Sequence, residues 1–314
     1  ELNKMERQGA RALRERYRVY RYLAHGRFED ISHTSRTMQQ VVRMARLFAE
    51  TSQPILLQGE VGSGKSLFAQ SIHNSSAYAQ GPFVTFRCAA GWDNQTEALA
   101  AAAKDADGGT LYLSAVNTLT PESQELLLYI LENAVVQVRI DEMPVSVSVR
   151  VIVSMDGSLL PLTEMGLFRW DLYYLLSPML LELPPLRTRR EDLEQAIDMC
   201  LDDCVTRRDR YVVLTKESRR VLLEYPWPGN YVQLRAFIER MALTASTRTV
   251  HDGYVRYLLQ QLYPASARTD PPCMESESLA EDASTLEAVL QRHKGSRTAA
   301  APELGISKTT LWRR

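Results

Sequence analysis

Apolar residues in the first half of the chain gather in short runs separated by stretches of helical spacing. The runs have the length of strands and lie at residues 55–58, 81–88, 108–113 and 145–154. Between them, as in residues 67–73, apolar positions recur three or four apart, and a further helix is predicted over residues 28–50. Strands that alternate with helices predict an α/β fold, in which helices cover both faces of a parallel sheet and a ligand binds at the carboxyl ends of the strands.

The pattern changes after Pro185. Four successive stretches then show helical spacing, at residues 192–207, 215–225, 231–245 and 252–262. They predict an all-helical lid. Residues 264–282 are rich in proline, serine and acidic residues and have no periodicity, which predicts a flexible linker.

The two ends of the chain are predicted to be helical. Residues 1–24 contain few helix breakers, and their apolar positions lie three or four apart with Arg16 interrupting them. This helix either pairs with a copy of itself or with an upstream domain, or it is a solvated leader; the pattern leaves both open. Residues 283–314 predict a helix, a turn at Gly305 and a second helix, for which Ser307 is a natural N-cap.

A glycine-rich loop, G-E-V-G-S-G-K-S, joins the first apolar run to the helix at residues 67–73. Glycines let the backbone N–H groups turn towards one point, which the N-terminus of the next helix also faces. Strand, loop and helix in this order are the context in which G-x-x-x-x-G-K-[ST] cradles nucleotide phosphates. The alternative is a loop that keeps its shape after losing its ligand.

The loop motif assigns a role to each of its polar side chains. Lys65 is predicted to reach the β- and γ-phosphates of ATP, and the Ser66 hydroxyl to hold Mg²⁺. The predicted nucleotide-binding residues are Gly59, Glu60, Val61, Gly62, Ser63, Gly64, Lys65, Ser66 and Leu67.

The C-terminal helix pair has the form of a helix-turn-helix that reads double-stranded DNA. Its second helix starts with hydroxyls and cations, as a major-groove recognition helix does. Pro302 is a departure, because it removes a hydrogen bond from the first helix. A helical hairpin that only dimerises is the alternative. The predicted DNA-binding residues are Arg297, Thr298, Ser307, Lys308, Thr309, Thr310, Arg313 and Arg314.

Composition narrows the class of protein. The apolar content of 45%, the charged content of 24% and a net charge of -1 are ordinary for a globular protein. The four cysteines lack a metal-binding spacing and are expected to be buried or idle thiols. Without a long apolar run or a signal peptide, the chain is expected to be cytoplasmic, with no membrane contact. It starts at Glu1 and stops at Arg314 inside an apparent helix, so both ends are expected to be cuts.

From residue 28 to its end, the chain resembles the bacterial enhancer-binding proteins, the AAA+ activators of sigma-54 RNA polymerase with a Fis-type helix-turn-helix. The resemblance rests on the phosphate loop and on the motifs G-P-F-V (81–84), G-G-T-L (108–111), F-R-W-D-L-Y-Y (168–174), L-P-P-L-R (183–187) and Y-P-W-P-G-N (225–230). It implies an AAA+ ATPase ring that binds upstream DNA. The predicted organisation is an N-terminal signalling or linker helix (1–27), an AAA+ α/β subdomain (28–186), a helical lid (187–263), a linker (264–282) and a truncated Fis-type domain (283–314).

The chain departs from the family at the positions that perform hydrolysis. The family motif G-G-T-L-F-L-D-E ends in two acids, for Mg²⁺ and for the attacking water, whereas Ser114 and Ala115 follow Leu113 here. The first arginine finger aligns with Arg169. The family's restraining asparagine, second arginine finger, lid arginine and sensor asparagine align with Arg87, Leu175, Val232 and Asp156. Useful hydrolysis is therefore not expected.

The segment that carries the family's sigma-54 contact is also short. The G-A-F-T-G-A loop lies between the second strand and the acidic strand, and here residues 89–107 alone fill that gap, without the motif and with room for one helix. The chain is therefore not expected to remodel sigma-54 polymerase.

Three functional hypotheses follow. The first is a DNA-binding transcriptional regulator whose AAA+ domain binds ATP as a structural ligand, forms a dimer or larger homo-oligomer, and works with RNA polymerase holoenzyme or with another activator. The second is an active ATPase that activates sigma-54 polymerase through an unorthodox carboxylate, for which the candidates are Asp105, Asp107, Glu122 and Asp156. The third is a nucleotide-dependent interaction or scaffold protein that does not read DNA.

Overall fold

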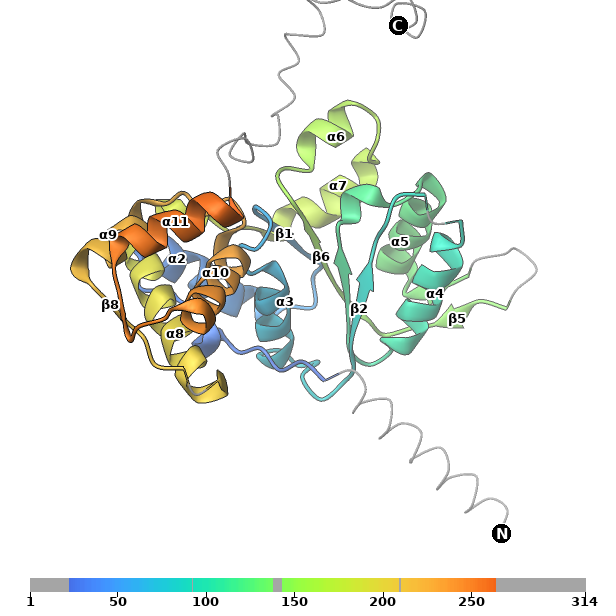
Figure 1. The fold of residues 1–314 in the computed structure, drawn as a ribbon. Coiled ribbons are helices and arrows are strands. Elements are labelled where there is room, and N and C mark those ends of the chain that lie inside the picture. Colours follow the sequence, from blue (N-terminus) through green and yellow to red (C-terminus); the bar gives the residue numbers. More distant parts are fainter. Residues whose placement is uncertain (1–22, 92, 138–142, 209, 264–314) are drawn as a thin grey trace, which may run out of the picture. The chain divides into compact units, whose positions relative to one another are not determined.

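The computed structural model describes residues 23–91, 93–137, 143–208 and 210–263 (Figure 1). The chain divides into two compact units, residues 1–259 and 260–314, and nearly all described residues belong to the first. The predicted leader helix, linker and helix-turn-helix, and Cys273 with them, lie outside the described residues apart from residues 23–27. No helix in the described ranges is long and apolar enough to cross a membrane.

A parallel five-stranded sheet with the order β2-β3-β6-β1-β7 forms the centre of the α/β part. Its strands are β1 (Ile55–Gln58), β2 (Phe83–Arg87), β3 (Thr110–Ser114), β6 (Arg150–Met155) and β7 (Leu180–Glu182). The apolar runs form strands because alternate residues are buried on opposite faces. In β1, Leu56 packs in one core cluster, and Ile55 and Leu57 pack in the other. The predicted α/β fold is confirmed.

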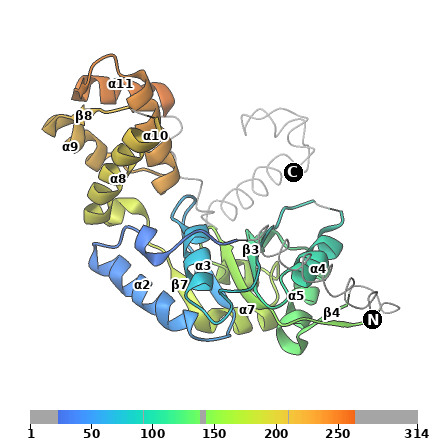
Figure 2. The same ribbon diagram turned by 90° about the horizontal axis from the view of Figure 1, so that it is seen from below.

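Helices cover both faces of the sheet (Figure 2). On one face lie α2 (Arg36–Ala49) and α3 (Lys65–Asn74). On the other lie α4 (Gln95–Asp105), α5 (Pro121–Asn133) and α7 (Trp170–Leu176), with the short α6 (Leu160–Glu164) next to α7. The described residues also form the 3₁₀ turns η1 (Phe28–Asp30), η2 (Val116–Thr118), η3 (Ser177–Met179) and η4 (Leu186–Thr188).

Two predictions about strands and helices were wrong in detail, and one strand was not predicted. The predicted strand at 145–154 is two strands, because β5 (Val145–Ser146) leaves the sheet and pairs antiparallel with β4 (Val135–Val136). The short β7 was missed. The helix predicted over 28–50 begins at Arg36, since the Ser35 side chain accepts a hydrogen bond from the Met38 N–H and caps the first turn.

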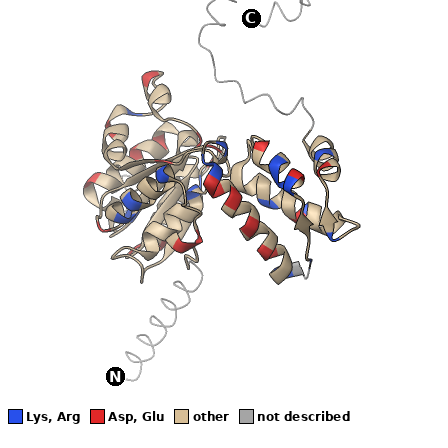
Figure 3. Ribbon diagram, turned by 90° about the vertical axis from the view of Figure 1, so that its left-hand side faces the viewer, with Lys and Arg blue, Asp and Glu red and all other residues tan. Residues whose placement is uncertain are grey.

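The lid contains α8 (Arg190–Arg208), α9 (Lys216–Glu224), α10 (Asn230–Thr244) and α11 (Asp252–Leu262). Acidic residues recur along α8 (Figure 3). The prediction of an all-helical lid was wrong in one respect, since β8 (Val213–Leu214) pairs with β9 (Thr249–Val250). Two residues of each strand suffice because the Ser218 hydroxyl donates to the Val250 carbonyl and fixes α9 to the pair.

The lid core is built around Trp227, which is fully buried. Its ring contacts those of Tyr225 and Phe237, and its indole N–H donates to the Leu222 carbonyl at 2.8 Å. Buried tryptophans usually satisfy their N–H in this way. The bend between α9 and α10 is thereby fixed, and it presents the first residue of α10, Asn230, to the rest of the chain.

Cys88, Cys200 and Cys204 are buried and form no disulfide. Burial raises the pKa of Cys88 to about 12 and that of Cys200 to about 11. Both thiols therefore stay protonated near neutral pH, as expected for structural cysteines.

Candidate functional site

The glycine-rich loop leaves the sheet at the end of β1 and leads into the first turn of α3. Gly62 and Gly64 have φ values of 74° and 104°, which side chains other than glycine rarely adopt. Gly64 precedes α3 without a side-chain cap, so the first N–H groups of the helix stay available for an anion. The buried Ser63 hydroxyl has no hydrogen-bond partner. This cradle fits the phosphates of a nucleotide.

Lys65 turns back into the loop that precedes it. Its ammonium group donates to the carbonyls of Gly59 and Glu60, each at 2.7 Å, and lies 2.7 Å from the Asp156 carboxylate. Asp156 follows directly after β6, the strand between β1 and β3. The structure therefore brings Lys65 and Asp156 together, a pairing that the sequence prediction did not contain.

The lid contacts the loop directly. The Tyr231 N–H donates to the Gly62 carbonyl at 3.1 Å, and the Asn230 amide donates to the Val61 carbonyl at 2.8 Å. A Cβ atom on Gly62 would lie 2.1 Å from the Gly229 carbonyl oxygen, so a larger residue at position 62 would push the two segments apart. Hydrogen bonds to the loop backbone thus fix the position of the lid at the loop.

Glu60 binds Arg187, which lies at the start of the lid. Its carboxylate accepts two hydrogen bonds from the Arg187 guanidinium, at 2.6 and 2.7 Å. These bonds hold the pKa of Glu60 below its usual value. The negative charge of the Glu60 carboxylate is thus balanced by the Arg187 guanidinium.

An apolar pocket adjoins the loop. It is lined by residues of the segment before α2, of α3 and of the lid, among them Ile31, Leu67, Phe68, Leu186, Met199 and Tyr231. Ser63 and Gly64 belong to both the pocket lining and the loop, so the two sites are continuous.

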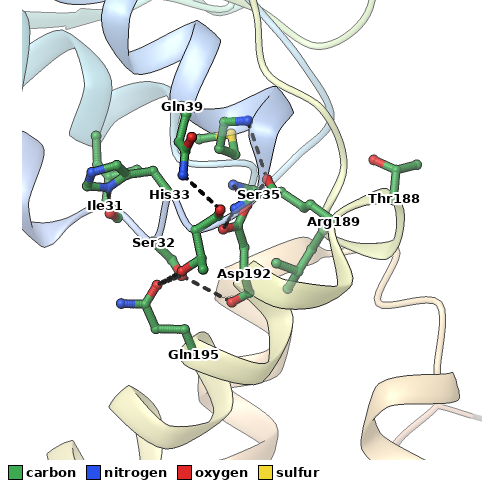
Figure 4. A network of polar contacts seen from close by, with 12 residues as sticks. Ile31, Ser32, His33, Ser35, Gln39, Thr188, Arg189, Asp192 and Gln195 are labelled. Carbon is green, nitrogen blue, oxygen red and sulfur yellow. Dashed lines mark hydrogen bonds and ion pairs between the residues drawn. The ribbon is translucent and has the colours of Figure 1, made fainter.

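The segment before α2 is tied to the lid by a polar network (Figure 4). The Asp192 carboxylate on α8 accepts from the Ser35 N–H at 2.9 Å and from its hydroxyl at 2.5 Å. Ser32 and Thr34 both donate to the Gln195 side chain at 2.8 Å. Sequence reasoning missed this network because its partners are about 160 residues apart.

The strand end at which the family motif has two acids carries none here. Ser114 is the last residue of β3 and lies in register with Ser154 of β6 and Arg87 of β2. Ala115 follows with a φ of 58°. No carboxylate is therefore presented at the end of this strand, whereas Asp156 lies at the end of the next one.

The other predicted site residues are dispersed. Arg169 precedes α7 and pairs with Asp171 through two hydrogen bonds, at 2.7 and 3.0 Å. Asp105 ends α4, and Asp107 accepts from the Ser148 N–H ahead of β3. The positions aligned with the second finger and the lid arginine, Leu175 and Val232, are both exposed.

The predicted DNA-binding residues are not part of the described chain. They are Arg297, Thr298, Ser307, Lys308, Thr309, Thr310, Arg313 and Arg314.

Fold, loop and lid together define an AAA+ domain of the P-loop class. Three family models match the chain, the sigma-54 interaction domain at residues 31–100 and 94–182, the AAA+ ATPase lid domain at 187–270 and the Fis family of bacterial regulatory proteins at 279–314. The chain belongs to the family of sigma-54 enhancer-binding transcriptional regulators.

Curated relatives include the transcriptional activator RocR of Bacillus subtilis, 30% identical over 90% of this chain and 67% of its own length. The transcriptional regulatory protein ZraR of Escherichia coli K12 is 31% identical over 88% of this chain and 66% of its own length. The chain thus spans about two thirds of the length of these relatives. The crystal structure of NtrX from Brucella abortus in complex with ATP is similar with a TM-score of 0.66, at 27% identity over 90% of this chain and 68% of NtrX.

Proposed function

We propose that this chain is a DNA-binding transcriptional regulator whose AAA+ domain binds ATP but hydrolyses it poorly or not at all, and that it acts without contacting sigma-54. The observation that carries the proposal is the end of β3, where Ser114 and Ala115 stand. Neither a hydroxyl nor a methyl group can polarise a water molecule as a general base.

Nucleotide binding is supported by the loop and the pocket. The loop offers a helix N-terminus, Lys65 and a buried hydroxyl without a partner, and the apolar pocket continues from it. The relative NtrX has been crystallised in complex with ATP and with ADP. We assign the phosphates to residues 59–67 and a Mg²⁺ contact to the Ser66 hydroxyl, which follows Lys65 in the first turn of α3.

Catalytic side chains are missing at more than one position that ATP hydrolysis needs. Loss of a single transition-state group commonly lowers turnover a hundredfold or more, and an arginine finger alone is worth about 10³ to 10⁵. Here the strand end lacks both acids, and Leu175 and Val232 supply no charge at two further positions. Arg169 remains, and we assign it to the nucleotide of a neighbouring copy in a homo-oligomer.

Independence from sigma-54 is supported by the length of the segment between β2 and β3. α4 occupies most of residues 89–107, and the described residues of this segment contain no second element. The sigma-54 interaction model matches in two pieces that meet at residues 94–100, inside this segment. We propose that the chain works instead with RNA polymerase holoenzyme of another kind or with another activator.

A phosphate-release assay tests the proposal. Purified chain with Mg²⁺ and ATP is expected to release inorganic phosphate no faster than the Lys65→Ala variant, because the end of β3 holds no base. The control is an added active ATPase, which shows that the assay conditions support turnover. Release by the parent chain that is lost in Lys65→Ala would establish an active ATPase and overturn the proposal.

The DNA-binding assignment makes a second prediction. Thr309→Ala is expected to change the preferred DNA sequence, because threonine at the start of a recognition helix contacts base edges. Arg297→Ala is expected to weaken all sites alike and to reduce the salt dependence of binding, as loss of one phosphate contact does. Selection of sites from a random DNA library checks both, and an equal loss across all sites for both variants would contradict the assignment.

A further inference from the structure

Asp156 is one of three partners of the Lys65 ammonium group. An ammonium group has three donors. In the structure these face the Gly59 carbonyl, the Glu60 carbonyl and the Asp156 carboxylate, all at 2.7 Å. A nucleotide phosphate can therefore reach Lys65 only by displacing one of the three.

The carboxylate is the partner that an incoming phosphate would displace. The two carbonyls belong to the loop backbone and cannot leave without reshaping the loop. The Asp156 side chain is 57% exposed, whereas that of Lys65 is 12% exposed. Asp156 also carries the charge that a phosphate shares, so the two anions repel each other at close range.

Other cations near the loop are already paired with carboxylates. The Glu60 carboxylate binds Arg187, so that pair brings no net positive charge to the loop. Arg189, which lines the adjoining pocket, lies 3.9 Å from the Asp192 carboxylate. A nucleotide that approaches the loop thus meets Lys65 and Arg189 when each already faces a carboxylate.

We propose that Asp156 is an internal competitor for the terminal phosphate of ATP and shifts the preference of the site from ATP towards ADP. The inference rests on the proposed nucleotide binding. Backbone N–H groups of such a loop cradle the α- and β-phosphates, whereas the lysine reaches the β- and γ-phosphates. ADP therefore keeps most of its contacts while the ion pair persists, but the γ-phosphate depends on the lysine and faces the carboxylate.

The test is titration calorimetry of the full chain with ATP and with ADP, each with and without Mg²⁺. Asp156→Asn keeps the shape of the side chain and removes its charge. The variant is expected to bind ATP about tenfold more tightly than the parent chain and ADP less than about threefold more tightly, with the gap shrinking at high salt. Asp198→Asn is the matched control, because Asp198 forms an exposed ion pair with Arg219 in the lid, and its affinities should equal those of the parent.

Each contrary outcome has a distinct meaning. If Asp156→Asn binds ATP and ADP more tightly to the same extent, Asp156 does not discriminate between the two nucleotides and the inference is overturned. Weaker binding of Mg²⁺-ATP by Asp156→Asn overturns the inference and makes Asp156 a magnesium ligand, the role needed for an active ATPase. An unchanged ATP affinity beside measurable ADP binding overturns the inference and leaves the proposed function standing, whereas no binding of either nucleotide by parent and variant overturns both.

Discussion

Lys65→Ala is expected to lower the affinity of the chain for ATP thirtyfold or more. Truncating one partner of a desolvated charge pair commonly costs about 2–5 kcal/mol, and each 1.4 kcal/mol is a factor of ten in affinity. Lys65 is the cation inside the loop, and it is nearly buried. Titration calorimetry with ATP measures the loss, and Lys216→Ala, at the exposed start of α9, is the control for removing a lysine elsewhere.

The same variant separates a structural nucleotide from a fuel. Sedimentation velocity of the parent chain is expected to show larger assemblies when ATP is added, because Lys65 of one copy and Arg169 of its neighbour would hold the same nucleotide. Lys65→Ala is expected to stay in the form seen without ATP, with no accompanying loss of turnover. Assembly of the variant that depends on ATP as strongly as in the parent would contradict this role of the nucleotide.

The phosphate loop could be predicted from the sequence because its geometry is local. The glycines that permit positive φ, the strand before them and the helix after them lie within a few residues of one another. The end of β3 is equally local, and Ser114 and Ala115 lie where the pattern places them. Features that depend on nearest neighbours in the chain are visible in a single sequence.

Contacts between distant segments could not be predicted in the same way. Asp156 was a candidate because of its place after a strand, but nothing in its neighbourhood indicates that it binds Lys65. The Ser35 and Asp192 pair joins residues that one would assign to separate parts of the chain. Such contacts follow from tertiary packing, which periodicity does not encode.

Short strands could not be predicted from the sequence for a related reason. β7 has three residues, of which Leu180 and Glu182 are exposed and Leu181 alone is buried. Its sequence has too little alternation to differ from a loop, and it becomes a strand because β1 offers it a free edge. Tertiary pairing therefore decided the element, and local preference did not.

Asn230→Ala is expected to destabilise the chain by about 3 kcal/mol and to weaken nucleotide binding with it. The side chain of Asn230 is fully buried, accepts from the Leu186 N–H at 2.7 Å and donates to the Val61 carbonyl at 2.8 Å. Its removal leaves these groups without partners, at about 1–3 kcal/mol for a buried polar group. Its φ of 48° adds about 1–2 kcal/mol for alanine, since left-handed backbone suits asparagine better.

Two further variants identify which of these effects acts. Glycine tolerates the backbone angle, so Asn230→Gly removes only the side-chain hydrogen bonds. Its free energy of unfolding, measured in urea, should therefore fall by less than that of Asn230→Ala. Asn133→Ala, at the exposed end of α5, should change stability by less than about 0.5 kcal/mol. If Asn230→Ala were as stable as this control, the amide would not be what holds the lid on the phosphate loop, and the coupling of lid and nucleotide would have to come from Arg187 and Glu60 instead.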